Sequence, residues 1–214
     1  MRRLVLILLM IPMVIAVPAA APQHSRLFPP EELGTLEGPD RDAWQRPDQV
    51  MDALRIFDGS TVADIGAGGG WFTMRLANRV GPNGVVYAED IQREMLEAIR
   101  RRVERAQLTN RVKTISGTPL DPRLPVPIDA ALIVDAYHEM EQPRVLLRNI
   151  ASALKPNGRI GIVEFKKDGW GPGGPMAERV DPELVISDAE AAGLRLVSKE
   201  TFLRYQYMLV FARA

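Results

Sequence analysis

Short apolar runs alternate with amphipathic stretches over most of this chain. Runs rich in β-branched and small apolar residues predict five strands, at Thr61–Ile65, Val85–Ala88, Val112–Ile115, Ala130–Val134 and Arg159–Val163. Helical patterns or loops separate these runs. This alternation of strands and helices indicates a parallel sheet with helices packed against it.

The chain ends with two more predicted strands, Leu194–Phe202 and Gln206–Phe211. Because no crossover helix fits between them, we expect these two strands to pair antiparallel. A helix is expected just before them, over Pro182–Ala192.

Apolar residues at helical spacing predict two further helices. One stripe lies between Arg93 and Ala106 and the other follows Pro47; their members are Met95, Ile99, Val103 and Ala106, and Val50, Met51, Leu54 and Phe57. The basic residues of the first helix, from Arg100 to Arg105, are expected to face water, with ligand binding as the alternative. A short helix is also expected to start at Asp40.

The first residues have a different composition. The basic pair Arg2-Arg3 precedes an apolar run over residues 4–17, and small residues follow it. The run is shorter than the roughly 20 residues that span a bilayer as a helix. Residues 1–21 are therefore interpreted as a signal peptide cleaved after Ala19 or Ala21, with an uncleaved membrane anchor as the alternative. Both interpretations predict an exported domain, periplasmic or secreted, with membrane contact only through this segment if it is uncleaved.

The rest of the chain divides into two parts. Residues 22–46 are rich in Pro, Gly and Glu, and we interpret them as a linker that folds over the domain as a lid. Residues 47–214 are interpreted as one ligand-binding domain. The pattern gives no indication of the oligomeric state.

Composition narrows the possible partners. Acidic and basic residues are equal in number, 27 of each, so no overall field attracts a polyanion and a nucleic-acid partner is not expected. The chain has no cysteine and only two histidines, His24 and His138. For this reason no metal site is predicted.

A glycine-rich turn follows the first predicted strand. The sequence reads Asp64-Ile65-Gly66-Ala67-Gly68-Gly69-Gly70-Trp71 and continues into a helical pattern. The glycines at 66, 68 and 70 accept dihedral angles that other residues avoid, and they leave room for a ligand close to the backbone. Trp71 stands where the dinucleotide fingerprint G-x-G-x-x-G needs its last glycine, which disfavours NAD. A glycine turn without a ligand is the alternative.

Asp90 lies about twenty residues beyond the glycines, at the end of the next predicted strand. A carboxylate in that position accepts hydrogen bonds from both hydroxyls of a ribose. The glycine turn and Asp90 together predict a ligand that contains a nucleoside.

Three elements in order carry a resemblance to a known family. They are Asp64-x-Gly66-x-Gly68-x-Gly70, Tyr87-Ala88-Glu89-Asp90-Ile91 and Leu154-Lys155-Pro156-Asn157-Gly158-Arg159. In these elements the chain resembles the class I S-adenosylmethionine-dependent methyltransferases, especially the small-molecule branch related to ubiquinone and menaquinone biosynthesis enzymes. The resemblance covers roughly residues 45–214. It implies a Rossmann-like α/β fold, with a seven-stranded, mostly parallel sheet in the order 3-2-1-4-5-7-6, strand 7 antiparallel and helices on both faces.

The same resemblance implies that S-adenosylmethionine is the cofactor. Asp64 and the three glycines would hold its methionine part, Asp90 would bind its ribose, and Ile91 would pack on its adenine. Many relatives place an acidic residue against the adenine amino group, where this chain has Thr118 and can offer only a hydroxyl.

The segment 134–140 follows the fourth predicted strand, at the edge where open α/β sheets bind ligands, so we expect it to face the methyl acceptor. His138 is the candidate general base, with Glu139 orienting it, and Tyr137 is expected to line the pocket. The alternative for His138 is a capping or packing role. Asp135 is expected to contact the cofactor or secure the loop rather than abstract a proton.

Two segments are candidate lids. The stretch Lys166–Pro175 combines glycines and prolines with the single aromatic residue Trp170. The residues Trp44, Gln45 and Arg46 are placed to close over the carboxylate of the cofactor. The alternatives are an ordinary long connection and a packing anchor, respectively.

These features predict a methyltransferase that acts on a small-molecule acceptor. A non-catalytic module that binds S-adenosylmethionine is the first alternative. A protein or RNA methyltransferase is the second, and the neutral charge and small size of the chain weaken it.

Overall fold

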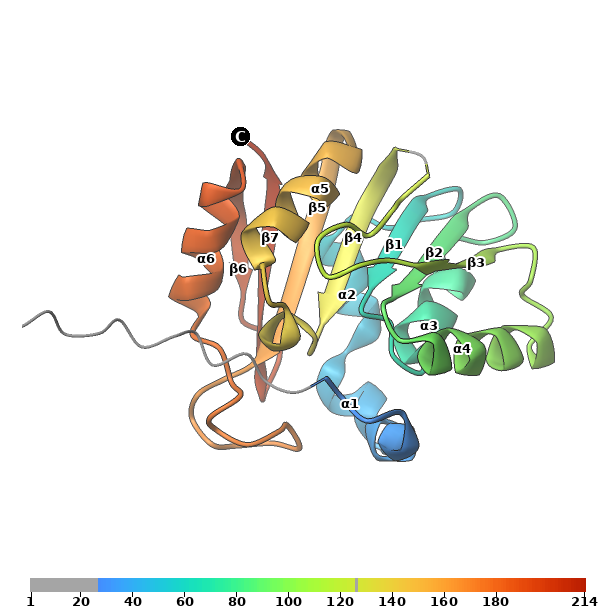
Figure 1. Cartoon of the computed structure of the whole chain (residues 1–214), viewed down its shortest axis with the longest axis horizontal. Helices are drawn as coiled ribbons and strands as arrows, with labels where there is room; N and C mark the ends of the chain where they lie inside the picture. The colour runs from blue at the N-terminus through green and yellow to red at the C-terminus, as the bar shows by residue number, and fades with distance from the viewer. Residues whose placement is uncertain (1–26, 126) are drawn as a thin grey trace, which may run out of the picture.

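The computed structural model describes residues 27–125 and 127–214, which form one seven-stranded sheet with helices on both faces (Figure 1). The strand order is β3-β2-β1-β4-β5-β7-β6, with β7 antiparallel to both of its neighbours. The strands are β1 (Thr61–Ile65), β2 (Val85–Asp90), β3 (Val112–Ser116), β4 (Ile128–Val134), β5 (Leu154–Phe165), β6 (Leu194–Glu200) and β7 (Gln206–Arg213). The expected fold class, strand order and antiparallel last pair are confirmed.

The helices divide between the two faces of the sheet. They are α1 (Arg41–Gln45), α2 (Pro47–Ala53), α3 (Trp71–Arg79), α4 (Arg93–Arg105), α5 (Pro143–Ala153) and α6 (Pro182–Ala191), with two 3-10 turns, η1 (Pro30–Leu36) and η2 (Tyr137–Glu139). Buried residues of α2, α3 and α4 belong to one core cluster, and those of α5 and α6 belong to the other. None of the helices in the described part of the chain is long and apolar enough to cross a bilayer.

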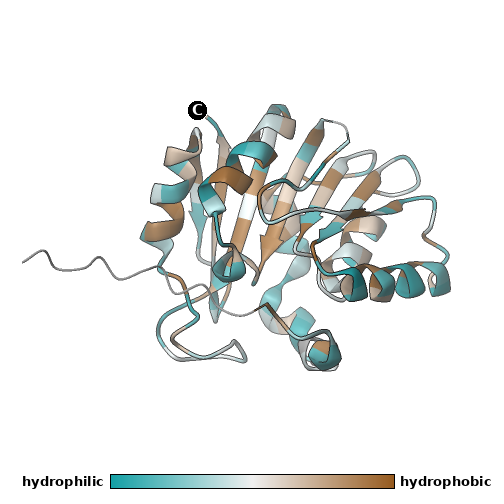
Figure 2. Ribbon diagram, viewed as in Figure 1, coloured by the Kyte–Doolittle hydropathy of each residue, from teal (hydrophilic) through white to brown (hydrophobic). Residues whose placement is uncertain are grey.

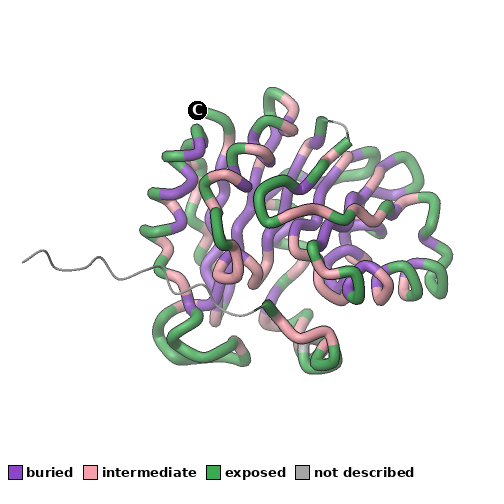
Figure 3. Tube along the Cα trace, in the orientation of Figure 1, coloured by how far each residue is buried: buried purple, intermediate pink, exposed green. Residues whose placement is uncertain are grey.

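Alternation along the strands builds these two cores. Val62 of β1 belongs to the first cluster and its neighbour Ala63 to the second, because successive strand side chains point to opposite faces. Both faces are covered by helices, so the central strands are largely apolar (Figure 2). Acidic residues such as Asp64 and Glu164 lie near the carboxyl ends of their strands. Figure 3 shows the resulting buried interior along the sheet.

The structure corrects two of the predicted apolar stripes. Helix α2 ends at Ala53 and Arg55 takes a left-handed φ of 56°, so Phe57 is 65% exposed rather than packed on the stripe. Ile56 fills the core instead. Helix α4 ends at Arg105, so Ala106 caps it and is exposed.

Several strands are longer than the pattern predicts. β2 continues to Asp90, and β5 starts at Leu154 and runs to Phe165. The extension of β5 carries Glu164 to the carboxyl edge of the sheet, beside the residues that follow β4. The segment 1–21, interpreted as a signal peptide or anchor, lies outside the described residues.

Candidate active site

A cavity of about 950 Å³ lies at the carboxyl ends of β1, β2, β4 and β5. Strand order reverses direction between β1 and β4, and open α/β sheets bind their ligands at such a point. Nine of the residues that the sequence indicated for cofactor binding or catalysis line the cavity, whereas Gly70 does not; the nine are Asp64, Gly66, Gly68, Asp90, Ile91, Thr118, Asp135, His138 and Glu139.

The three glycines of the turn have different surroundings. All three have a positive φ, 65° at Gly66, 53° at Gly68 and 80° at Gly70. A Cβ on Gly66 would lie 2.8 Å from the Cβ of Ala136, whereas one on Gly68 would meet no atom within 4 Å. Gly68 therefore faces open space where a ligand fits. Gly70 lies behind the wall as the N-cap of α3.

Asp64 is the next-to-last residue of β1, and its buried side chain lines the cavity. Its Oδ2 accepts a hydrogen bond of 2.6 Å from the hydroxyl of Thr73 on α3. Burial raises the pKa of Asp64 to about 6, although the bond from Thr73 works in the opposite direction. This carboxylate is suited to a positively charged or hydrogen-donating ligand group.

Asp90 is fixed by backbone donors at the end of β2. Its two carboxylate oxygens accept bonds from the N–H groups of Gly68, at 2.9 Å, and Gln92, at 2.8 Å. Each oxygen keeps a second acceptor position, so the group can still take two hydroxyls. Ile91, which follows it, is 37% exposed within the cavity wall.

Glu89 is a site residue that the sequence analysis quoted but did not assign. It is 3% exposed, and its Oε2 lies 3.4 Å from the backbone N of Gly66, which donates to it. Burial raises the pKa of Glu89 to about 8, with a further contribution from Asp90. The adjacent acid pair at the end of an apolar strand was the signal for it.

Thr118 uses its hydroxyl within its own loop. The hydroxyl oxygen accepts a bond of 2.9 Å from the N–H of Asp121 and donates to the carbonyl oxygen of that residue at 3.2 Å. The residue still lines the cavity, beyond the end of β3. Its hydroxyl is shared with Asp121, so it has less capacity for an adenine contact than the sequence suggested.

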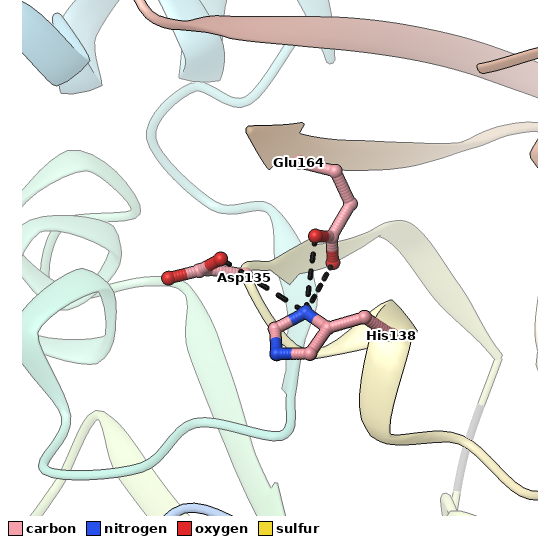
Figure 4. Close-up of side chains that lie close together, drawn as sticks. All are labelled: Asp135, His138 and Glu164. Carbon is pink, nitrogen blue, oxygen red and sulfur yellow. Dashed lines mark hydrogen bonds and ion pairs between the residues drawn. The ribbon is translucent and has the colours of Figure 1, made fainter. Parts of the chain in front are cut away.

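His138 lies between two carboxylates beyond the ends of β4 and β5 (Figure 4). Its Nδ1 is 3.1 Å from Oε2 of Glu164 and 4.0 Å from Oδ1 of Asp135. Glu164 also accepts a bond of 2.8 Å from the backbone N–H of Tyr137, which fixes the turn η2 against β5. The sequence analysis missed Glu164; a lone acid at the end of the apolar run Ile160–Val163 was the available signal.

The charges around His138 shift the pKa values of the group. Burial by itself would lower the pKa of His138, but the hydrogen bond and charge of Glu164 raise it to about 9. Burial and the charge of Glu164 raise the pKa of Asp135 to about 7. With nothing else bound, His138 is held as a cation at neutral pH, and a general base must instead be neutral.

Glu139 connects the histidine to the N-terminal segment. Its Oε1 is 3.8 Å from Nε2 of His138, and its Oε2 accepts a bond of 3.2 Å from the N–H of Phe28. Tyr137 does not line the cavity as expected. Its hydroxyl points to the other side and donates a bond of 2.7 Å to Asp188 on α6.

The N-terminal segment covers part of the cavity. Residues 27–29 and much of η1 line it, and the side chain of Gln92 donates to the carbonyl oxygen of Phe28 at 3.1 Å. Arg102 of α4 pairs with both carboxylate oxygens of Glu37 and donates to the carbonyl oxygen of Gly69. Arg102 thus holds this segment to the glycine turn and does not simply face water.

Arg41, rather than the three residues named from the sequence, reaches the cavity from α1. Its guanidinium lies 4.2 Å from the ring centre of Trp71. Trp44 packs on Phe165 and Gln45 bonds to Gln206 in the interior. Neither they nor Arg46 line the cavity.

The loop after β5 forms another wall. Residues 172–175 line the cavity, whereas Trp170 is 72% exposed and does not. Arg179, which is 7% exposed, holds the loop together by donating to the carbonyl oxygens of Lys166, Trp170, Gly173 and Gly174.

Comparison with known proteins agrees with this arrangement. Residues 62–158 match the family described as a methyltransferase domain. A solved S-adenosylmethionine-dependent methyltransferase from Aquifex aeolicus has a TM-score of 0.80 and 27% identity, over 86% of this chain and 98% of the other. In sequence and in fold the chain is similar to the class I S-adenosylmethionine-dependent methyltransferases. The ubiquinone/menaquinone biosynthesis C-methyltransferase of Ectopseudomonas mendocina is 28% identical over 165 residues, or 76% of this chain.

The similar proteins differ from this chain in length and from one another in reaction. The chain spans 61% of the length of the Ectopseudomonas enzyme. The same fold also occurs in the [4+2]-cyclase SpnF, with a TM-score of 0.68 and 18% identity. The fold therefore does not by itself determine the reaction.

The residues present fit the cofactor of this family, S-adenosylmethionine. The open space at Gly68 accepts a ligand close to the backbone, and Asp90 offers two acceptor positions for a ribose. Asp64 stands at the end of β1, where the ammonium group of the methionine part would find a buried carboxylate. Ile91 gives adenine an apolar surface.

Proposed function

We propose that the protein transfers the methyl group of S-adenosylmethionine to a small-molecule acceptor. The observation that carries the proposal is the division of one cavity into two halves. The ends of β1 and β2 carry most of the cofactor-binding candidates, and the residues after β4 together with the end of β5 carry a separate polar group around His138. A volume of about 950 Å³ is at the upper end of ordinary ligand sites, so it has room for both molecules.

Methyl transfer from a sulfonium needs little covalent help from the protein. The sulfonium supplies an activated methyl group, and the main task of the chain is to hold the acceptor in line with it. In this proposal Asp64, Gly68 and Asp90 fix the cofactor. The turn η2 and the loop at 172–175 enclose the acceptor on the opposite side and exclude water.

A small acceptor is favoured by how the cavity is covered. The N-terminal segment and the loop after β5 both form part of its wall, and a concave site of this kind is typical of small-molecule binding. The neutral net charge supports the same choice. Relatives whose names refer to ubiquinone and menaquinone biosynthesis make dihydroxyaromatic compounds the first acceptor class to test.

The test is an incubation of the full chain with S-adenosylmethionine that carries an isotope-labelled methyl group. A panel of dihydroxyaromatic compounds serves as acceptors, and labelled product is followed by mass spectrometry. Transfer to at least one compound, abolished in the Asp90→Ala variant, is expected. Cofactor binding without transfer to any member of the panel would contradict this acceptor class.

The cationic state of His138 favours a second candidate function, a module that binds S-adenosylmethionine without catalysing transfer. The two candidates differ in turnover, not in binding. A module of this kind leaves S-adenosylmethionine unchanged with every acceptor, whereas an enzyme accumulates S-adenosylhomocysteine as methyl groups move.

We further propose that the domain is exported, through the segment 1–21. The basic pair Arg2-Arg3, the short apolar run and the small residues after it support this. Fractionation of cells that express the full chain, with mass spectrometry of its N-terminus, tests the proposal. An N-terminus near Ala20 or Pro22, or an intact chain in the membrane, is expected. An intact Met1 on a protein confined to the cytosol would overturn it.

A further inference from the structure

Asp135, His138 and Glu164 bring three metal-ligating side chains together at one point of the cavity wall. They come from three elements: the residue after β4, the turn η2 and the end of β5. One donor atom from each side chain lies within 4.8 Å of the other two. Figure 4 shows the carboxyl groups of Asp135 and Glu164 directed toward the same imidazole nitrogen of His138.

The spacing of these atoms fits a shared cation. Two ligands bound at about 2.1 Å lie about 3.0 Å apart at a right angle and about 4.2 Å apart on opposite sides of the ion. Nδ1 of His138 is 3.1 Å from Glu164 and 4.0 Å from Asp135, so both separations fall inside that range. The third separation, between the carboxylates of Asp135 and Glu164, is within 4.8 Å.

The partners of the three groups leave the required atoms in place. Oε1 of Glu164 accepts from the N–H of Tyr137, and Oε2 is the oxygen that faces His138. Nε2 of His138 has the carboxylate of Glu139 at 3.8 Å. A metal-bound histidine normally has a carboxylate or carbonyl beside its second ring nitrogen, which orients the ring, and Glu139 occupies that place.

We propose that Asp135, His138 and Glu164 form a site for a divalent first-row cation, Mn²⁺, Fe²⁺ or Zn²⁺. One imidazole and two carboxylates make a mixed nitrogen and oxygen ligand set, which suits these ions better than Ca²⁺. Three protein ligands leave further coordination positions vacant, as in catalytic rather than structural metal sites. Because all three residues line the cavity, those positions face the acceptor half and suit an oxygen atom of the acceptor.

The order of residues in the chain conceals this site. The donors occupy positions 135, 138 and 164, so Glu164 is 26 residues from His138, and only the pairing of β4 with β5 brings them together. The chain also lacks cysteine and has few histidines, which is why composition predicts no metal site. The proposed site needs one histidine only.

The proposal is tested by titrating the full chain, stripped with a chelator, with Mn²⁺ and following the signal of free Mn²⁺ by electron paramagnetic resonance. Binding of one Mn²⁺ per chain with a dissociation constant well below about 1 mM is expected, with Zn²⁺ displacing it and Ca²⁺ failing to do so. Asp135→Asn and Glu164→Gln should each weaken Mn²⁺ binding by at least about tenfold.

Glu141→Gln is the matched control, because Glu141 is a carboxylate on the same cavity wall, three positions from His138. This variant should bind Mn²⁺ as the unmodified chain does. If Glu164→Gln fails to fold, Asp135→Asn alone decides, since Asp135 is the most exposed of the three. No Mn²⁺ binding below about 1 mM, or equal binding by Asp135→Asn and the unmodified chain, would overturn the proposal.

The cation site stands independently of methyl transfer. Affinity for S-adenosylmethionine is measured on the same samples, because Asp64, Gly68 and Asp90 are not ligands of the proposed ion. An unmodified chain that binds S-adenosylmethionine but not Mn²⁺ contradicts the cation site alone. Retained Mn²⁺ binding without cofactor binding contradicts the proposed function alone.

Discussion

Replacing Glu89 by Gln removes a charge that the fold accommodates poorly. Glu89 is 3% exposed at the end of β2, and the carboxylates of Asp90 and Asp64 both work against its ionisation. Burial is the larger cause, and the pKa rises from an ordinary 4.5 to about 8. A glutamine keeps the shape of the side chain and can still accept the bond from Gly66.

The sign and size of the effect follow from this shift. A group whose pKa is higher in the folded protein contributes stability in full below its unfolded pKa, and that contribution is lost as the pH rises through the folded pKa. At pH 7, the pH is 2.5 units above the pKa of 4.5 that Glu89 has in the unfolded chain. Because each unit corresponds to about 1.4 kcal/mol, the free energy of unfolding at pH 7 is about 3 kcal/mol lower than at low pH. Glu89→Gln should avoid most of this loss.

The assay is urea unfolding of both proteins, without ligand, at pH values from 4 to 8. The two free energies of unfolding should agree near pH 4, and the variant should become the more stable protein as the pH rises. Glu94→Gln, on the exposed side of α4, is the control and should change stability by less than about 0.5 kcal/mol at every pH. A difference between Glu89→Gln and the unmodified chain that does not vary with pH would refute the reasoning.

Four further variants test other contacts. Gly66→Ala should cost about 2–3 kcal/mol in urea unfolding because of its left-handed φ and the contact with Ala136, whereas Gly68→Ala should cost about 1 kcal/mol but lower the affinity for S-adenosylmethionine in calorimetry. Glu37→Gln should change stability by less than about 1 kcal/mol, yet stopped-flow should show faster cofactor release as the bond to Arg102 is lost. Tyr137→Phe should cost about 1–2 kcal/mol in urea unfolding with unchanged cofactor affinity, because only the bond to Asp188 is lost. Equal effects of Gly66→Ala and Gly68→Ala would contradict the roles given to the two glycines. Weaker cofactor binding by Tyr137→Phe would contradict the placement of Tyr137 outside the cavity.

Local pattern was sufficient for most of the fold. Each central strand carries apolar residues on both faces, so the sequence alone was enough to recognise it as a strand. The gap between β6 and β7 is too short for a crossover helix, and this predicted their antiparallel pairing. The ends of the helices were harder to predict from the sequence. Nothing local at Phe57 indicated that Arg55 would turn the chain and expose the aromatic ring.

The cofactor half of the cavity could be predicted because its residues are close in sequence to a glycine turn or a strand end. The N–H of Gly68 donates a hydrogen bond to Asp90, as expected for residues at the ends of two neighbouring strands. The acceptor half could not be predicted in the same way. Glu164 and Arg41 reach it from elements far from His138 in the chain, and the direction of the Tyr137 ring depends on a bond to α6.

The most direct test of the central claim is calorimetry of the full chain with S-adenosylmethionine and with S-adenosylhomocysteine. Saturable binding of at least one of them is expected, and Asp90→Ala should bind at least about tenfold more weakly, because a charged acceptor for the ribose hydroxyls is lost. No heat of binding for either ligand at about 1 mM, or equal binding by Asp90→Ala and the unmodified chain, would contradict the account.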